Sequence, residues 1–254
     1  MLKNKIGLSS LLALVFVFNY LETTVETWFK NRSGLGLEMG YKIAYAFHGL
    51  EGNYSFVYHD VTNDVAVIGY SISYFFILPM LFLAVVFSLI KRKDISPYRV
   101  FSLALTIDYL VSLPFFLFFP VPERWYFPDS QAMLLSDKWT SNLIEALRPI
   151  SGLDNCFPSF HVSMTVVFIL VCYIFKVRLR TPVLALGVTI ILSTFVLGIH
   201  WLPDMIAGLA VGVSSVMLAL RLDHALLNTE RNGIRSNPQA TIPKIKIENQ
   251  PPKV

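Results

Sequence analysis

Apolar stretches close to 20 residues long recur along this chain, and they limit its possible folds more than any other feature. We place six of them at residues 6–24, 66–90, 98–119, 160–177, 182–199 and 203–220. An α-helix of such a length crosses the hydrocarbon core of a bilayer. Charged residues make up only 15% of the chain, against about a quarter in soluble domains. The sequence predicts an all-α polytopic membrane protein, a bundle of six transmembrane helices.

Lysine and arginine are distributed unevenly between the two sets of loops. Of the 21 Lys and Arg residues, 15 lie in segments that six spans place on the same side as both termini. All 4 tryptophans lie on the other side, as expected of aromatic residues at a membrane interface. By the positive-inside rule the basic side is cytoplasmic, and the other is extracytoplasmic or lumenal. The net charge of +4 follows from this topology, so we expect no nucleic-acid partner.

We interpret the chain as one membrane catalytic domain, residues 1–222, followed by a cytoplasmic tail, residues 223–254. The tail is polar and contains prolines, so we expect it to be disordered. The first span resembles an uncleaved signal anchor, and a short interfacial helix is expected near residues 39–50. Cys156 and Cys172 are separated by about three helical turns, so we expect no disulfide between them.

Three short polar stretches fall at the same outer membrane surface: Pro122–Arg124, Pro158–His161 and His200–Asp204. His200 and Asp204 are four residues apart, so they are neighbours on one face of a helix. The carboxylate can then orient the imidazole and leave its other nitrogen as a nucleophile or base. Two of the stretches begin helices, where free amides favour an anion. The group indicates a phosphoryl-transfer site; the alternative is interfacial histidines beside a packing acid.

The stretches PSFH and HWLPD resemble the second and third signature blocks of the type-2 phosphatidic acid phosphatase superfamily. The resemblance covers roughly residues 66–220. It implies six core spans and chemistry without a metal or other cofactor. It also implies that His200 attacks phosphorus, that Asp204 is its paired acid, that His161 protonates the leaving group, and that Ser159 contacts the phosphoryl oxygens.

Two departures from the family pattern concern its cations. The third block usually begins Ser-Arg, whereas this chain has Ser193-Thr194, and no segment fits the first block, Lys-x6-Arg-Pro. The stretch FPVPERW is similar to the first block of the branch that contains the inositol phosphorylceramide synthases. This similarity makes Arg124 the main candidate phosphate ligand, with Arg148 as a second candidate and Ser193 as a further one.

A dianionic phosphomonoester needs more cations than a singly charged phosphodiester. The missing cations therefore favour a metal-independent phosphotransferase that moves a lipid headgroup through a phosphohistidine, as inositol phosphorylceramide synthases do. Its partners would be its lipid substrates and the membrane lipids. The alternative within the family is a phosphatase acting on phosphatidate or an isoprenyl phosphate. The alternative of another class is a non-catalytic scaffold or transporter, which should show polar or broken helices in matched halves.

Two features inside the spans call for separate interpretations. Asp108 lies in the middle of a span, where an acid is a functional candidate by default. We interpret it as a protonated or hydrogen-bonded structural residue, because it lies about half a bilayer from the histidines. Gly208 and Gly212 form a small-x3-small pattern, which predicts close packing of two helices.

Overall fold

The fold is entirely helical over the residues that the computed structural model describes, which are 4–33, 35–52, 63–137 and 155–236. The α-helices are α1 (Lys5–Ser33), α2 (Leu35–Glu51), α4 (Asp64–Ile72), α5 (Leu78–Ile90), α6 (Ser96–Phe118), α8 (Phe160–Ile174), α9 (Arg180–Val196) and α10 (Leu202–Ser236). A π-helical segment, η1 (Ser73–Ile77), joins α4 to α5, and two short 3-10 turns, η2 (Arg124–Tyr126) and η3 (Pro128–Ser130), follow α6. The predicted all-α class is confirmed.

Within the described ranges, four helical segments are long and apolar enough to cross a membrane. They are Lys5–Glu22, Asp64–Ile90, Ser96–Phe118 and Leu202–Thr229. The other two predicted spans correspond to α8 and α9, which are apolar but only 15 and 17 residues long. Large apolar side chains such as Phe18, Met80 and Phe87 are exposed on the outside of the bundle. Because helices with apolar outer surfaces are stable in lipid, the chain is a multi-pass integral membrane protein.

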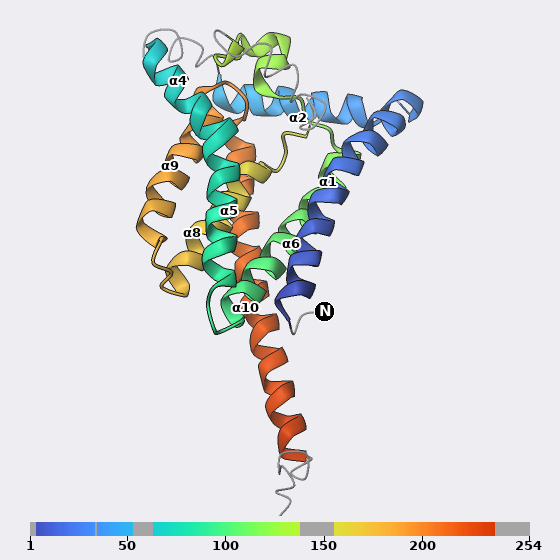
Figure 1. Cartoon of the computed structure of the whole chain (residues 1–254). Helices are drawn as coiled ribbons and strands as arrows, with labels where there is room; N and C mark the ends of the chain where they lie inside the picture. Colours follow the sequence, from blue (N-terminus) through green and yellow to red (C-terminus); the bar gives the residue numbers. More distant parts are fainter. Residues whose placement is uncertain (1–3, 34, 53–62, 138–154, 237–254) are drawn as a thin grey trace, which may run out of the picture.

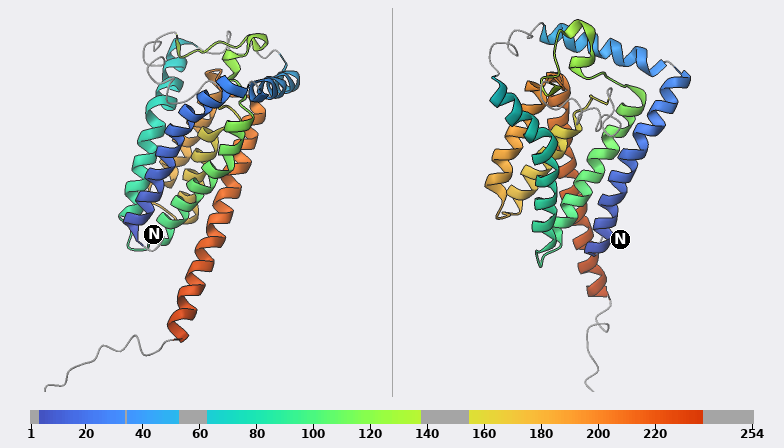
Figure 2. Two further views of the ribbon diagram at one scale, coloured as in Figure 1. Left: turned by 90° about the vertical axis from the view of Figure 1, so that its right-hand side faces the viewer. Right: turned by 45° about the horizontal axis from the view of Figure 1, so that its top comes forward.

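α8 contacts α10, α6 and α5, and α10 also contacts α6 (Figures 1 and 2). α1 packs on α6, and α9 packs on α8. Buried apolar residues from these helices form the main core, among them Leu12, Val85, Phe101, Phe168 and Val216. α2 lies across one end of the bundle (Figure 1), and it confirms the short helix predicted near residues 39–50. We refer to this end as the α2 end.

α10 meets α8 at two glycines. A Cβ atom on Gly208 would lie 2.5 Å from the carbonyl oxygen of Ser159, and one on Gly212 would lie 2.6 Å from that of Ser163. Both distances are too short for a real contact, so a side chain at either position would push the helices apart. Small residues allow such backbone approach in membranes. The predicted close packing is confirmed, and it fixes the start of α8 against α10.

The opposite end of the bundle is held by two basic residues, the partly buried Lys5 and the buried Arg99. Lys5 Nζ donates to the carbonyl oxygens of Ile90 and Arg92, at 2.7 and 2.8 Å. Arg99 Nε bonds Asp223 Oδ1 at 2.5 Å, and both side chains are almost fully buried. These contacts join α1, α10 and the turn between α5 and α6. They place the N-terminal segment and that turn at one end, in agreement with the charge distribution.

α10 is longer than the sequence analysis predicts. It continues to Ser236, so the prediction that the tail is disordered from residue 223 is wrong for residues 223–236. The stretch DHALLNTERNGIRS contains no proline, and its Ala, Leu, Glu and Arg residues are good helix formers. Figure 1 shows this part of α10 extending beyond the rest of the bundle. Residues 237–254 lie outside the described residues.

Asp108 is fully buried in α6, facing α8. Ser163 Oγ donates a hydrogen bond to Asp108 Oδ2 at 2.9 Å. An intramembrane carboxyl group that bonds a neighbouring helix stabilises the packing of the two helices. The contact supports the structural interpretation of this residue.

Candidate active site

His200 and Asp204 lie at the start of α10, at the α2 end of the bundle. Pro203 fits the first helical turn, where its missing N–H costs no hydrogen bond. His200 Nδ1 lies 3.3 Å from Asp204 Oδ2, which also accepts from the backbone N–H of Trp201 at 3.1 Å. His200 is 3% exposed and Asp204 is fully buried. His200 Nε2 has no hydrogen-bond partner among the described residues.

The surroundings of His200 favour its protonated form. Burial lowers the pKa of this imidazole, but the charge and the hydrogen bond of Asp204 raise it, and the net result is a pKa above the ordinary value. The carboxylate therefore stabilises positive charge on the ring. The same stabilisation would apply to a ring that becomes positive by forming a bond through Nε2.

His161 reaches the same place from the first turn of α8. Ser159 caps this helix, because its hydroxyl accepts from the backbone N–H of Val162 at 3.4 Å. The backbone N–H of Ser159 donates to the carbonyl oxygen of Asp204 at 3.1 Å, which joins the starts of α8 and α10. The ring centroids of His161 and His200 lie 5.7 Å apart. The structure therefore brings the two predicted histidines together.

Tyr74 is a neighbour of His161 that the sequence analysis missed. Its ring stacks on the imidazole at a centroid distance of 4.6 Å and an interplanar angle of 29°. Tyr74 belongs to the π-helical segment η1, in which the N–H of Leu78 donates to the carbonyl oxygen of Ser73, five residues earlier. π-helical turns are rare and often occur at functional sites. The signal available in the sequence was Pro79, whose missing N–H disturbs helical bonding one turn earlier.

Arg124 lies against the segment that carries His200, and its role as a phosphate ligand stays a prediction. Its backbone N–H donates to the carbonyl oxygen of Ile199 at 3.0 Å, and its buried guanidinium lies over the rings of Phe195 and Trp201. Arg124 Nη1 is 3.4 Å from Glu51 Oε2, an ion pair that the sequence analysis did not anticipate. An arginine in this position can bind a phosphoryl oxygen, although Glu51 already neutralises part of its charge.

Glu51 connects α2 to the start of α10. Its Oε1 accepts from the backbone N–H of Leu202. Burial raises the pKa of the Glu51 carboxyl above its ordinary value, against the opposing effects of that N–H and of Arg124. No local pattern marks this glutamate in the sequence, because its partners are more than 70 residues away along the chain.

Ser193 and Arg148 are the remaining predicted phosphate ligands. Ser193 Oγ donates to the carbonyl oxygen of Ile190 at 2.6 Å, so its proton is used within α9. Its role as a phosphate ligand stays a prediction. The carbonyl oxygen of Thr194 accepts from the N–H groups of Ile199 and His200, which positions the loop that carries the histidine. Arg148 lies outside the described residues.

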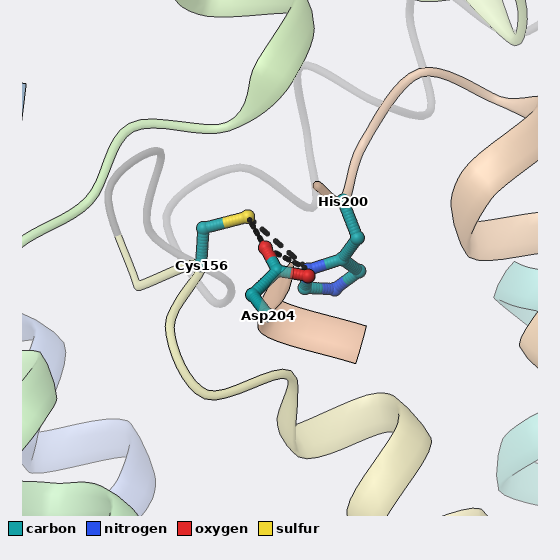
Figure 3. A group of neighbouring side chains, drawn as sticks. All are labelled: Cys156, His200 and Asp204. Carbon is teal, nitrogen blue, oxygen red and sulfur yellow. Dashed lines mark hydrogen bonds and ion pairs between the residues drawn. The ribbon is translucent and has the colours of Figure 1, made fainter. Parts of the chain in front are cut away.

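Cys156 is a further residue of the site that the sequence analysis missed. Its buried Sγ donates to Asp204 Oδ2 at 2.8 Å and lies 3.1 Å from His200 Nδ1 (Figure 3). Burial and the charge of Asp204 raise the pKa of the thiol well above its ordinary value, so the thiol is protonated and can donate. Both cysteines are free. The sequence analysis treated Cys156 only as a disulfide candidate, although it lies two residues before Pro158.

Cys156, His200 and Asp204 together form a potential metal-binding group. One ligand atom from each lies within 4.8 Å of the others. The expectation of chemistry without a metal stays a prediction, but the sequence analysis did not anticipate this cluster. The cluster escaped notice because Cys156 lies in a different loop from the other two residues.

The comparisons with known proteins identify the family. The model of the PAP2 superfamily matches residues 48–218, which is more than half of the chain and includes both histidines. The chain belongs to the PAP2 superfamily. This PAP2 protein matches no curated protein and no solved structure in the other two comparisons. Membership in the PAP2 superfamily indicates lipid phosphate phosphatase or phosphotransferase chemistry in general.

Replacing Arg124 in this PAP2 protein should weaken the binding of a phosphate analogue such as vanadate. We expect Arg124→Ala to reduce the binding free energy by about 1.5–3 kcal/mol, the usual scale of a charge-assisted contact. Calorimetric titration measures the loss. Because Arg124→Ala leaves Glu51 buried without its charged partner, the variant Arg124→Met/Glu51→Gln should be measured beside it to separate binding from unfolding. Normal binding by Arg124→Ala, with binding lost in Arg148→Ala, would exchange the roles of the two arginines.

Proposed function

We propose that this PAP2-superfamily protein is a six-span membrane enzyme that transfers a phospho-headgroup between lipids through a phosphohistidine on His200. One observation carries the proposal. Asp204 holds the His200 ring at Nδ1, while the buried Nε2 of the same ring has no hydrogen-bond partner among the described residues. The His161 ring lies beside it. An oriented nucleophile next to a second proton carrier is the arrangement that two-step group transfer requires.

The reaction has two steps. In the first, His200 Nε2 attacks phosphorus, the N–P bond forms, and the P–O bond to the leaving group breaks as His161 donates a proton to the departing oxygen. In the second, an acceptor hydroxyl attacks the phosphohistidine, its proton passes to His161, and the N–P bond breaks. Throughout both steps the proton stays on His200 Nδ1 and is hydrogen-bonded to Asp204, whose carboxylate stabilises the positive ring.

The charges around the histidines support a phosphodiester substrate. Among the described residues, the cation that supports phosphate binding is Arg124, which lies over the ring of Trp201, next to His200 in the chain, and is paired with Glu51. Glu123 is close enough to affect His200 electrostatically. A dianionic monoester in these surroundings would be poorly neutralised, whereas a phosphodiester carries one negative charge. This balance supports headgroup transfer of the inositol phosphorylceramide synthase type over phosphatase activity.

The proposed topology places the reaction at the extracytoplasmic or lumenal leaflet. α1 begins, and α5 turns into α6, at the end of the bundle opposite the α2 end (Figure 1), and Lys5, Arg92 and Arg99 belong to these segments. The positive-inside rule makes that end cytoplasmic. α8 and α9 complete six spans if the bilayer is crossed partly by the loops at their ends. The lipid phosphate would then approach His200 and His161 from the outer headgroup region.

The experiment that tests the proposal compares transfer with hydrolysis. The purified protein in lipid nanodiscs is incubated with a radiolabelled inositol phospholipid and ceramide, and in parallel with radiolabelled phosphatidate or an isoprenyl phosphate. We expect the transfer product to form faster than phosphate is released from either monoester. The variant His200→Ala serves as the blank. Rapid release of phosphate from a monoester, with no transfer product from any diester, would make the protein a phosphatase and contradict the proposal.

A further inference from the structure

Three different metal-ligand atoms converge at the start of α10, and the proposed reaction uses only two of the three side chains. Cys156 Sγ lies 2.8 Å from Asp204 Oδ2 and 3.1 Å from His200 Nδ1, and the latter two atoms are 3.3 Å apart. Figure 3 shows the three side chains turned toward one another from two separate segments of the chain. The sulfur, nitrogen and oxygen donors match those that zinc and cadmium prefer.

The distances are close to those of a tetrahedral zinc site. Zinc bonds of about 2.0 Å to nitrogen and oxygen place those two atoms about 3.3 Å apart, which is the distance that His200 and Asp204 already have. A bond of about 2.3 Å to sulfur places the sulfur about 3.5 Å from each of them. Cys156 Sγ would therefore have to move about half an ångström away from the other two atoms. This is the difference between the distance across an S–H hydrogen bond and the distance between two ligands of one metal ion.

Two further observations favour a cation at this place. Asp204 is fully buried, and its Oδ1 has no hydrogen-bond partner among the described residues, so hydrogen bonds compensate the charge of this carboxylate only in part. The carboxylates of Asp204, Glu51 and Glu123 act on the site, against the guanidinium of Arg124. Over the part of the chain that the structure describes, these acidic groups and one arginine give a local charge balance that attracts a divalent cation.

We infer that Cys156, His200 and Asp204 form a binding site for a thiophilic divalent cation, Zn²⁺ or Cd²⁺, and that the bound ion switches off the nucleophile. On binding, the thiol releases its proton to the buffer and a metal–sulfur bond forms. The ion also takes the lone pair of His200 Nδ1, so the ring proton moves to Nε2. A protonated Nε2 has no lone pair with which to attack phosphorus. The inhibitory effect rests on the proposed function, whereas the binding does not.

The first test measures binding without any substrate. The purified protein is titrated with Cd²⁺ while the ultraviolet absorption of cadmium–thiolate bonds is recorded. We expect one Cd²⁺ per chain with the unaltered protein and with Cys172→Ala, a matched control because Cys172 is the other buried cysteine. Cys156→Ser should lose the absorption. Absence of the absorption from the unaltered protein, or its persistence in Cys156→Ser, would overturn the site whether or not the protein is active.

The second test measures inhibition in the transfer assay. Zn²⁺ should inhibit the unaltered protein and Cys172→Ala equally, and a chelator should restore their activity. Relative to its own uninhibited rate, Cys156→Ser should need at least tenfold more Zn²⁺ for half inhibition. Cadmium binding at Cys156 without loss of turnover would overturn the inhibitory role. If no lipid phosphate is turned over, the proposed function fails while the absorption titration still decides the metal site.

Discussion

His200→Ala should reduce the rate of lipid turnover by about 10⁴-fold or more. The nucleophile forms the only bond to phosphorus in the first step, and the removal of such a group costs more than the removal of any assisting residue. Nε2 of this ring is buried and lacks a partner among the described residues, so no neighbouring side chain is positioned to replace it. Initial rates with a radiolabelled lipid substrate measure the loss. The unaltered protein should acquire an acid-labile radiolabel through its phosphohistidine, and His200→Ala should not.

His224→Ala is the matched control for this variant. His224 lies in the far part of α10, where it is exposed and bonds Asn228, and its replacement should leave the rate unchanged. A pH profile adds an independent measure. Activity should fall as the pH drops through the pKa of His200, and this fall should lie above the ordinary histidine value of 6.5, because protonation occupies Nε2. Retained activity in a folded His200→Ala protein would contradict the assignment of the nucleophile.

His161→Gln should reduce turnover by about 10²–10⁴-fold, the usual contribution of a general acid and base. The glutamine keeps a polar side chain beside Tyr74 but cannot carry the proton to an alkoxide. The size of the effect should depend on the leaving group. The leaving group of a p-nitrophenyl phosphodiester departs without a proton. The variant should therefore lose far less of its rate with this substrate than with a lipid phosphodiester.

Tyr74→Phe is the companion variant for His161. It retains the aromatic ring that stacks on the imidazole and should therefore keep most of the activity with both substrates. If His161→Gln slows the p-nitrophenyl substrate and the lipid substrate equally, then His161 does not act as the acid in the first step.

The fold was largely predictable from the sequence because a bilayer imposes a simple pattern on it. The segments 66–90 and 98–119 agree with helical spans to within a few residues, since apolar length alone decides whether a helix can cross. The π-helical turn at Tyr74 was not predicted, because a bulge of one residue hardly alters an apolar run. The helical continuation to Ser236 was missed because polar composition was read as disorder, although the segment has no proline before Pro238.

The candidate site was predictable only where its residues are close in sequence. His200 and Asp204 share one helical turn, so their spacing already predicted their contact. Cys156 reaches the same place from a loop and Glu51 from the end of α2, and no spacing rule reports on a contact across more than 40 residues. The ion pair of Glu51 with Arg124 is of the same kind. Such contacts depend on how the loops at the α2 end fold back over the bundle.

The tight contact between α8 and α10 divides the molecule into a fixed part and an adjustable part. Gly208 and Gly212 hold the two helix backbones together, and the Ser159 N–H bonds the carbonyl oxygen of Asp204. The two imidazoles therefore move as one rigid body, and a bulkier lipid cannot be admitted by spreading them. Room for a different headgroup has to come from α2 and the segment after α6, which surround the histidines without carrying them. Changes in those two segments can thus alter which lipids this fold accepts, while the positions of the two imidazoles relative to phosphorus stay the same.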